Sequence, residues 1–482
     1  MIEDEIVTIK GKIISGVVAL STRNILLNIF SFAANFLLTI VLTPAIFGVF
    51  FIVSAVISFL SYFSDVGLAA ALIQKKQEPS RKELVSVFTL QELLVITIVG
   101  IVFFLSPLLS HIYKLSSEGM FLLYALLISF FLSSLKTIPS LILERKLDFA
   151  LLAVSQIVET VAYYIVTVIL AFMNFGIASF AWGAIVRGIV GVIAIYYISP
   201  WRPGVGLSLE PIKELISFGI PFQTNSFLAL IKDDLMTLFL GSILPAFQVG
   251  YVGWAKKWGE SALRAIIDSV IRVTFPAYSR LQNHKEVLGK ALEKTIFFLA
   301  FFIFPATVVL VFSMQTLIRI IPKYSKWEPA VFAFYLFAAG SIFAAFSSPL
   351  VNALNALGKI KTTLVLMVMW TVLTWALVPL FTFKIGYNGV ALAALLISST
   401  GFIPVVIMRR YIAFKVWEPM QKPLIATILM SLPLYILIQH AASIYIFALA
   451  MVLSGLVYLA LSWFWMRDQI LPYIPKSFKI KP

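Results

Sequence analysis

A row of alternating charges interrupts the apolar sequence near the middle of this chain. Residues 250–278 read GYVGWAKKWGESALRAIIDSVIRVTFPAY, which is long enough to cross a bilayer as a helix. Five of the charges lie four residues apart with alternating sign: Lys256, Glu260, Arg264, Asp268 and Arg272. Such pairs are neighbours on a helix and support one another. Because a helix has about 3.6 residues per turn, the row winds around the axis and cannot all face lipid.

The basic side chains of this segment have the chemistry to hold a diphosphate. A guanidinium group donates two parallel hydrogen bonds to phosphate oxygens, and an ammonium group supplies a compact positive charge. Another apolar segment, residues 177–198, also carries an arginine. The candidate substrate contacts are therefore Arg264, Lys256, Lys257, Arg272 and Arg187.

Carboxylates inside apolar segments form a second group of candidates. Burying their charge is costly, so an intramembrane ionisable residue is a functional hypothesis by default. The candidates for binding a proton or a coupling ion are Asp234, Glu159, Asp233 and Glu260. A structural alternative stays open for each. Glu159 would then pair with Arg187, and the Lys232–Asp234 run would pair with the charges of residues 250–278.

The composition indicates that these groups lie in a membrane protein. Of the 482 residues, 61% are hydrophobic and only 12% are charged, against about 25% charged residues in soluble domains. Repeated apolar runs near 20 residues predict an all-α polytopic membrane protein. The runs are continuous rather than alternating, which excludes a transmembrane β-barrel. A second apolar segment follows the first at once, so the first is expected to be a retained span and not a signal peptide.

The apolar runs predict about fourteen transmembrane helices. They cover residues 24–42, 46–63, 84–105, 120–140, 150–173, 177–198, 215–240, 250–278, 291–312, 330–350, 362–383, 389–408, 424–439 and 444–465.

A faint internal repeat suggests how these helices are grouped. Pro139 and Gly176 recur 210 residues later as Pro349 and Gly386, and each glycine is followed five residues later by alanine. Transporters are often built from such repeats, with the substrate between them. We therefore expect two six-helix lobes around a central cavity, residues 1–205 and 206–410. Residues 411–482 would add a C-terminal helix pair and a cytoplasmic tail.

The distribution of basic residues predicts the orientation. With these spans, 26 of the 37 Lys and Arg fall at the termini or in the loops on their side, and five fall on the opposite side. The positive-inside rule then places both termini in the cytoplasm of a cell (inner or plasma) membrane. The same loops account for the net charge of +15, so no nucleic-acid partner is expected.

No catalytic or cofactor motif is evident. Cysteine is absent and the three histidines are far apart, so neither thiol chemistry nor a metal cluster is expected. There is no Walker-type loop for ATP. The sequence therefore predicts no enzyme activity and no cofactor, with transport driven by an ion gradient such as H⁺ or Na⁺, by the membrane potential or by the substrate gradient. One alternative is a membrane-embedded glycosyltransferase or polymerase, which we expect to carry acids and arginines in a large outer loop; residues 313–329 hold one acid, Glu328.

Several segments resemble one transporter family when taken in this order. They are LTPAIFGVF (42–50), FSDVGLAAALIQKK (63–76), IPSLILERKLDF (138–149), VGYVGWAKK (249–257), FPAYSRLQNH (275–284) and ALGKIK (356–361). The chain resembles the polysaccharide transporter family of oligosaccharide-lipid flippases. That family belongs to the superfamily of multidrug and toxin extruders and peptidoglycan-precursor flippases. One departure is Ile40, since family members often carry arginine four residues before the proline of the first turn.

The resemblance implies both a fold and a function. It implies twelve to fourteen helices in two lobes around a V-shaped cavity, with alternating access and coupling to H⁺ or Na⁺. The implied substrate is an undecaprenyl-diphosphate-linked oligosaccharide, moved from the cytoplasmic to the outer leaflet. Membrane lipids, a glycan polymerase and a chain-length regulator are the implied partners. An ion-coupled efflux antiporter for organic cations stays open as the alternative function.

Overall fold

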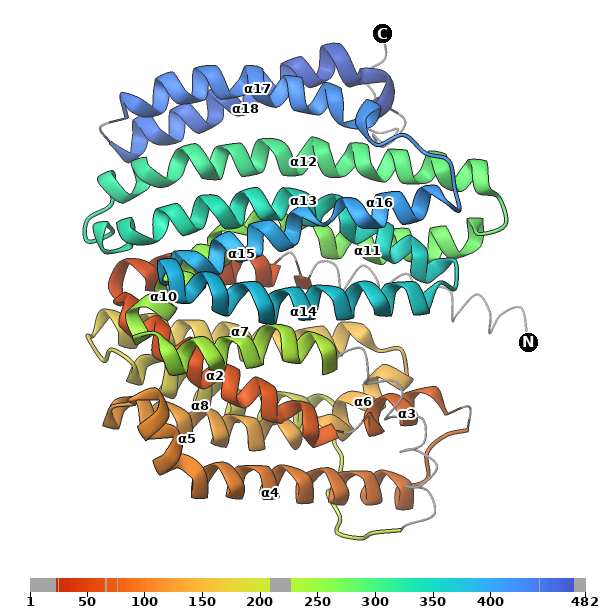
Figure 1. Ribbon diagram of the computed structural model, residues 1–482. Helices are drawn as coiled ribbons and strands as arrows, with labels where there is room; N and C mark the ends of the chain where they lie inside the picture. Colours follow the sequence, from red (N-terminus) through yellow and green to blue (C-terminus); the bar gives the residue numbers. More distant parts are fainter. Residues whose placement is uncertain are drawn as a thin grey trace. The chain divides into compact units, whose positions relative to one another are not determined.

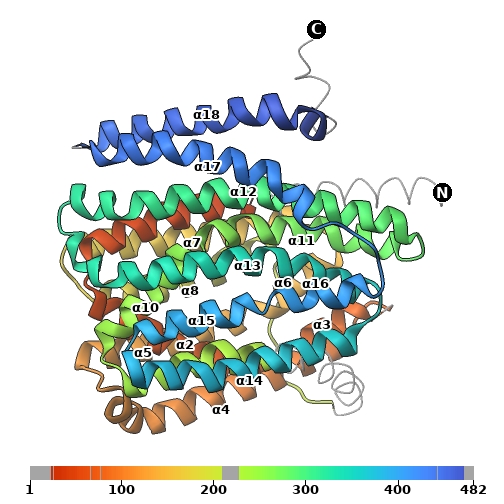
Figure 2. The same cartoon turned by 45° about the horizontal axis from the view of Figure 1, so that its top comes forward.

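Helices make up the regular structure of this chain (Figures 1 and 2). The computed structural model describes residues 23–24, 26–65, 67–75, 77–208, 227–441 and 443–471, and among these residues no β-strand occurs. Eleven of the described helices are long and apolar enough to cross a membrane. The expectation of an all-α, multi-pass membrane protein is therefore confirmed, and the count of fourteen spans stays a prediction.

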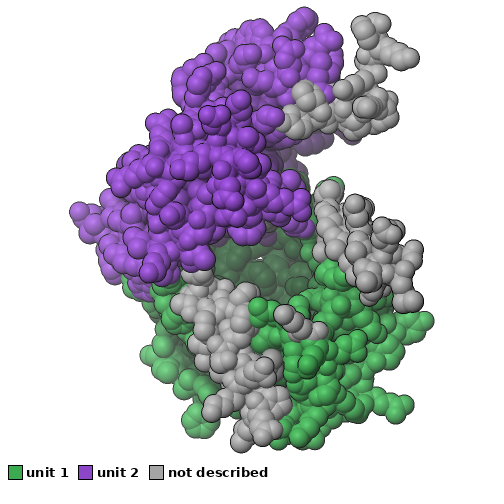
Figure 3. Space-filling view, turned by 90° about the vertical axis from the view of Figure 1, so that its right-hand side faces the viewer, with its two compact units in different colours: residues 1–250 green, residues 251–482 purple. Residues whose placement is uncertain are grey.

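The chain separates into two compact units, residues 1–250 and residues 251–482 (Figure 3). The division falls inside the short helix α10 (Ala246–Gly259). The predicted lobes, with boundaries near residues 205 and 410, stay a prediction. Part of the predicted seventh span, residues 215–226, lies outside the described residues, and its remainder belongs to a helix over residues 227–243.

Within its described residues, the first unit contains seven labelled helices and two more. They are Leu26–Val41, α2 (Pro44–Asp65), α3 (Leu68–Gln74), α4 (Arg81–Tyr113), α5 (Ser117–Ser134), α6 (Thr137–Arg145), α7 (Phe149–Phe172), α8 (Ala178–Ile198) and residues 227–243.

Helix α8 packs against both α5 and α7. Small residues allow this close approach: a Cβ added at Gly188 would lie 2.8 Å from Cδ1 of Leu132 on α5. Lipid tails are as apolar as the helix surfaces, so close packing through small residues is a main source of helix association in membranes. The small residues of α8 thus let this helix lie close to its neighbours, so that polar side chains of α7 and α8 can contact one another.

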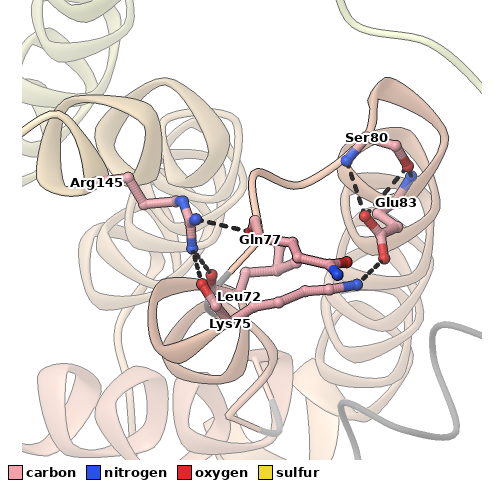
Figure 4. A network of polar contacts seen from close by, with 6 residues as sticks. All are labelled: Leu72, Lys75, Gln77, Ser80, Glu83 and Arg145. Carbon is pink, nitrogen blue, oxygen red and sulfur yellow. Dashed lines mark hydrogen bonds and ion pairs between the residues drawn. The ribbon is translucent and has the colours of Figure 1, made fainter.

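A polar network fastens the segment between α3 and α4 (Figure 4). Arg145, at the end of α6, donates hydrogen bonds to the backbone oxygens of Leu72, Lys75 and Gln77. The Lys75 ammonium pairs with Glu83, whose carboxylate also forms a capping box with Ser80 at the start of α4. The carbonyls at the end of α3 are therefore satisfied by a side chain from a helix more than 60 residues away in the sequence.

The second unit begins within α10 and contains the remaining helices. They are α11 (Ser261–Leu281), α12 (Lys285–Ile320), the 3₁₀ helix η1 (Ser325–Ala330), α13 (Val331–Ala356), α14 (Ile360–Ile385), α15 (Asn388–Ser399), α16 (Phe402–Arg409), α17 (Trp417–Gln439) and α18 (Ile444–Ile470).

Helix α13 lies in the middle of this unit and packs on α11, α12 and α15. The last two helices form a pair beside α12, as both views show (Figures 1 and 2). Buried Trp254 on α10 stacks on buried Trp327 of η1, with ring centroids 5.1 Å apart. Helices α11 and α13 also pack directly on one another.

Three predicted spans are interrupted in the structure. Residues 250–278 do not form one helix: α10 ends at Gly259 and α11 begins at Ser261. A Cβ at Gly259 would lie 2.8 Å from Cβ of Phe337 on α13, so the chain turns where glycine permits close contact. Neither helix counts among the eleven apolar helices, because α10 has only 14 residues and charges interrupt the sequence of α11.

The other two interruptions lie four residues before a proline. Helix α5 ends at Ser134 and α6 contains Pro139; α15 ends at Ser399 and α16 contains Pro404. Proline lacks the N–H that would bond to the carbonyl four residues earlier, and its ring clashes with that carbonyl. The spans predicted over residues 120–140 and 389–408 therefore lie within the candidate membrane spans Ser117–Arg145 and Asn388–Arg409, and a local break divides each of them into two helices.

Some helices extend well beyond the predicted spans. Helix α12 has 36 residues where 291–312 was expected, and most of the presumed loop at 313–329 is helical. At about 1.5 Å per residue, this helix is roughly 54 Å long and exceeds a hydrocarbon core of about 30 Å. Its ends therefore reach into the interfacial layers.

Candidate functional site

A carboxylate on α7 is held between two cations in the first unit. Lys136 Nζ lies 2.5 Å from Oε2 of Glu159, and Arg187 Nη2 lies 3.6 Å from Oε1 of the same carboxylate. The Glu159 side chain is 9% exposed, whereas that of Arg187 is 48% exposed. A charge this deeply buried is tolerated only when it is paired, and this carboxylate has two partners.

Each member of this cluster comes from a different place in the sequence. Lys136 lies between α5 and α6, Glu159 lies on α7 and Arg187 on α8. A Cβ at Gly191 would lie 2.2 Å from Oε2 of Glu159 and 3.0 Å from Nζ of Lys136. Glycine at this position therefore makes the room that the ion pair occupies. One turn away, the guanidinium carbon of Arg187 lies 6.0 Å from the ring centroid of Tyr163, within reach of a cation–π contact.

The structural alternative for Glu159 and Arg187 is confirmed as a contact: the two side chains are paired. Sequence reasoning missed Lys136, which was not among the candidate residues. The signal that could have found it is Pro139, which ends the apolar helix early and leaves Lys136 at the junction. The predicted roles of Glu159 in coupling and of Arg187 in substrate binding stay predictions.

Two further predicted acids lie on the wall of a cavity in the first unit. The cavity has a volume of about 350 Å³ and is lined by Ser58, Ser61, Tyr62, Ala229, Leu230, Asp233 and Asp234. Ser58 Oγ on α2 donates a hydrogen bond of 3.0 Å to Oδ2 of Asp234. Lys232 Nζ lies 3.3 Å from Oδ2 of its neighbour Asp233. The helix over residues 227–243 thus presents both carboxylates to α2, and a hydroxyl-rich turn of α2 faces them.

The charges of α10 and α11 are arranged differently, because they lie mostly on the surface of the second unit. Arg264 donates from Nη2 and Nε to Oε2 of Glu260, at 2.7 and 3.1 Å, and the Arg264 side chain is 66% exposed. Glu260 lies at the junction of the helices, next to the first turn of α11, where the helix dipole favours a negative charge.

The remaining basic candidates also lie on these helices. Lys257 and Arg272 are exposed and Lys256 is partly buried. The side chain of Asp268 lies outside the described residues, so the predicted row is seen from Lys256 to Arg264 and again at Arg272. The four-residue spacing correctly predicted the Glu260–Arg264 pair.

Relatives of this chain are found among polysaccharide proteins. The family model described as "polysaccharide biosynthesis protein" matches residues 37–332. The lipopolysaccharide biosynthesis protein WzxC of Escherichia coli (strain K12) is 23% identical over 354 residues, which cover 73% of this chain and 71% of WzxC. An uncharacterized membrane protein in the cps region of Klebsiella pneumoniae is also 23% identical, over 78% of this chain and 77% of its own length.

Solved structures share the fold. A structure of the lipid II flippase MurJ in an inward closed conformation aligns with a TM-score of 0.72 at 18% identity, covering 92% of this chain and all of MurJ. An inward-facing multidrug transporter of the MATE family aligns with a TM-score of 0.62 at 16% identity, covering 82% of this chain and 98% of the transporter. At these identities the likeness concerns the fold. The family match, in contrast, spans more than half of the sequence and includes α10, α11 and most of the candidate residues, so the chain belongs to the polysaccharide biosynthesis protein family.

Proposed function

We propose that this protein is a flippase that moves a polyprenyl-diphosphate-linked oligosaccharide from the cytoplasmic to the outer leaflet by alternating access. Membership of the polysaccharide biosynthesis family carries the proposal. Named relatives support it: WzxC is a lipopolysaccharide biosynthesis protein, and ExoT of Rhizobium meliloti (strain 1021), 22% identical over 253 residues, is a succinoglycan biosynthesis transport protein. The MurJ-like fold supports transport rather than catalysis.

The basic residues of α10 and α11 are the proposed diphosphate contacts. Arg264 keeps an exposed guanidinium although it bonds to Glu260, so its free N–H groups can bond to phosphate oxygens. Lys256, Lys257 and Arg272 would add positive charge along the same helices. An anionic ligand would thus replace Glu260 as the partner of Arg264, and this exchange costs little because an exposed pair is weak.

Arg187 is the proposed contact from the first unit. It is half-exposed and lies farther from Glu159 than Lys136 does, so it can leave the carboxylate while Lys136 stays. Protonation of Glu159 would weaken its hold on Arg187 and make that arginine available to a diphosphate. This is the proposed route by which proton binding is coupled to substrate binding.

The Asp233–Asp234 cavity is the second proposed coupling site. Carboxylate and hydroxyl oxygens are suitable ligands for hard cations, and Ser58, Ser61, Asp233 and Asp234 provide them around one space. Coupling to Na⁺ would use this cavity, and coupling to H⁺ would use it or Glu159. Transport by the Asp234→Asn variant, measured once in an H⁺ gradient and once in a Na⁺ gradient, shows which of the two ions uses this cavity.

The proposed setting is the cell (inner or plasma) membrane with both termini in the cytoplasm. The excess of Lys and Arg on the side of the termini supports this orientation. The lipid carrier would be of the undecaprenyl type. A glycan polymerase and a chain-length regulator are the proposed partners on the outer side.

A deletion strain tests the proposal. We expect lipid-linked oligosaccharide to accumulate on the cytoplasmic leaflet, and the wild-type gene but not Arg264→Gln to reverse this. Arg280→Gln is the matched control, because Arg280 is an exposed arginine at the far end of the same helix. Absence of accumulation in the deletion strain, combined with raised sensitivity to cationic dyes, would contradict the proposal and favour the efflux antiporter. Dye sensitivity is tested as well because the chain shares its fold with a MATE multidrug transporter.

A further inference from the structure

A second, uncharged cavity lies inside the second unit. Its volume is about 300 Å³, at the lower end of the roughly 300–1,000 Å³ found for small-molecule sites. Three helices line it: α11 contributes Ile271, α14 contributes Trp370, and α13 contributes Ser347, Ser348, Val351, Asn352 and Asn355. None of these lining side chains is ionisable, so the cavity differs from the acid-lined cavity of the first unit.

Hydrogen bonds to neighbouring helices fix the polar groups of this cavity. Asn352 Nδ2 donates to Oγ1 of Thr274 at 3.2 Å and lies 3.5 Å from the backbone oxygen of Ile271. Since a carbonyl oxygen only accepts, these contacts orient the amide with Oδ1 turned the other way. Trp370 Nε1 donates to Oγ1 of Thr400 at 3.0 Å, which holds the indole ring in one orientation.

Two amide groups keep unused hydrogen-bonding capacity. Among the described residues, Oδ1 of Asn352 accepts no hydrogen bond. Asn355 Oδ1 accepts a hydrogen bond of 2.7 Å from Oγ1 of Thr363, and the Nδ2 of Asn355 has no partner among the residues that the structure describes. The two asparagines are three positions apart on α13 and therefore lie on one face of the helix. The cavity thus offers one fixed acceptor, a second amide group, two serine oxygens and an indole.

We infer that this cavity is a binding subsite for one uncharged sugar residue of the lipid-linked oligosaccharide. A sugar ring carries several hydroxyl groups that both donate and accept, and it has apolar C–H faces that pack on an aromatic ring. The amides, the serines and Trp370 match both properties. A diphosphate would find no cation here, and a lipid tail would offer no hydrogen bond to Oδ1 of Asn352 or to the second amide atom of Asn355.

The position of the cavity on α11 connects it to the proposed diphosphate contacts. Arg264 precedes Ile271 by seven residues, which is nearly two turns, so both side chains project from the same face of the helix about 10 Å apart along its axis. Arg272 follows Ile271 directly. A diphosphate held by Arg264 would place the attached sugars along the face that carries Ile271. The inference rests on the proposed function, because it takes the ligand to be a glycosylated lipid diphosphate.

Binding of two lipids to the full-length protein in nanodiscs tests the inference. The probes are undecaprenyl diphosphate and the lipid-linked oligosaccharide extracted from the deletion strain. We expect the double variant Asn352→Leu, Asn355→Ala to bind the glycosylated lipid about tenfold more weakly and undecaprenyl diphosphate unchanged. Arg264→Gln should weaken both. The oligosaccharide released from its lipid should compete for wild-type protein and fail to compete for the double variant.

Control variants exclude a general defect of folding. Gln439→Leu removes an exposed amide at the end of α17, and Trp375→Phe alters a tryptophan about 140° around α14 from Trp370; neither residue lines the cavity. Both should bind the two lipids as wild type does. Equal affinity of wild type and double variant for the glycosylated lipid would overturn the sugar subsite and would leave the proposed flippase function standing. Failure of wild type to bind either lipid would overturn the proposed function, and the subsite with it.

Discussion

Two charge clusters of this protein, one in each unit, are opposites in construction. In the first unit, Glu159 is buried between Lys136 and Arg187, and three segments of the sequence meet to form the cluster. In the second unit, Glu260 and Arg264 are four residues apart and the arginine is largely exposed. A buried cluster is expensive to disturb because any charge left alone is desolvated. An exposed local pair is weak, so its members can exchange partners with a ligand.

This contrast assigns different tasks to the two clusters. The first needs neighbouring helices to be in place and therefore reports the packing of α5, α7 and α8 on one another. The second needs only a helix turn, and its arginine stays accessible. A transporter needs both properties: a cluster whose charge state is connected to helix packing, and a contact that forms and breaks with substrate.

The largest effect is expected when the buried carboxylate is removed. Glu159→Leu leaves Lys136 and Arg187 close together without a counter-charge, which we expect to lower the free energy of unfolding by roughly 3 kcal/mol. Unfolding by sodium dodecyl sulfate in mixed micelles measures this. Glu260→Leu is the control from the exposed pair and should change stability by less than about 1 kcal/mol. Equal losses in the two variants would show that burial does not separate the clusters.

A smaller effect is expected from crowding the same cluster without removing a charge. In Gly191→Ala the added methyl group would lie 2.2 Å from Oε2 of Glu159, so the carboxylate or α8 must move. Overpacking of this kind costs about 1–3 kcal/mol. Gly100→Ala on α4 is the matched control in the same unit, because nothing lies within 4 Å of its added Cβ. There alanine should be neutral or slightly stabilising, since it favours helix more than glycine does. A stable, fully active Gly191→Ala protein would argue against the crowded geometry.

Most of the helix positions could be predicted from the sequence, because a hydrocarbon core requires apolar runs of a set length. The breaks that divide some of these runs into two helices could not be predicted. Pro139 and Pro404 follow helix breaks, yet Pro305 lies inside α12 without ending it. Whether a proline ends a helix depends on neighbouring segments that satisfy the freed carbonyl. The same holds for the turn after Gly259, which depends on contact with α13.

The candidate site was predictable where its contacts are local. The spacing of Glu260 and Arg264 was sufficient to predict their pair, since residues four apart on a helix are neighbours. Lys136 was not found, because it reaches Glu159 only after α5 ends early and α8 packs closely on α7. The sugar subsite was not found for a similar reason: its asparagines and serines on α13 and its tryptophan on α14 are common residue types, and only the packing of these helices brings them together.

Loss of the exposed arginine should affect ligand binding and leave folding unchanged. In Arg264→Gln we expect binding of undecaprenyl diphosphate to weaken about tenfold, because a charge-assisted hydrogen bond contributes about 1.5–3 kcal/mol. Nanodisc binding measures this, and mixed-micelle unfolding should show a change below about 0.5 kcal/mol. Glu260→Gln serves as the complementary variant. It removes the internal competitor for Arg264, so affinity should stay equal or rise; a loss of affinity there would mean that Glu260 positions the arginine for its ligand.

The smallest expected effect is the coupling free energy between the two side chains of a pair. It distinguishes the two clusters best, because it isolates the interaction from the other consequences of each substitution. A double-mutant cycle on Glu260→Gln and Arg264→Gln should give a coupling free energy of about 0.3–0.5 kcal/mol, typical of exposed helix pairs, and it should fall at 1 M salt, where the Debye length is about 3 Å. The equivalent cycle on Glu159→Gln and Lys136→Met should give a larger value that salt changes little, since the pair is shielded from solvent. If salt weakened the second coupling as much as the first, water would reach Glu159 in the resting protein. A proton could then reach the carboxylate while Arg187 is still in place, and the release of Arg187 would follow protonation, as proposed above, rather than precede it.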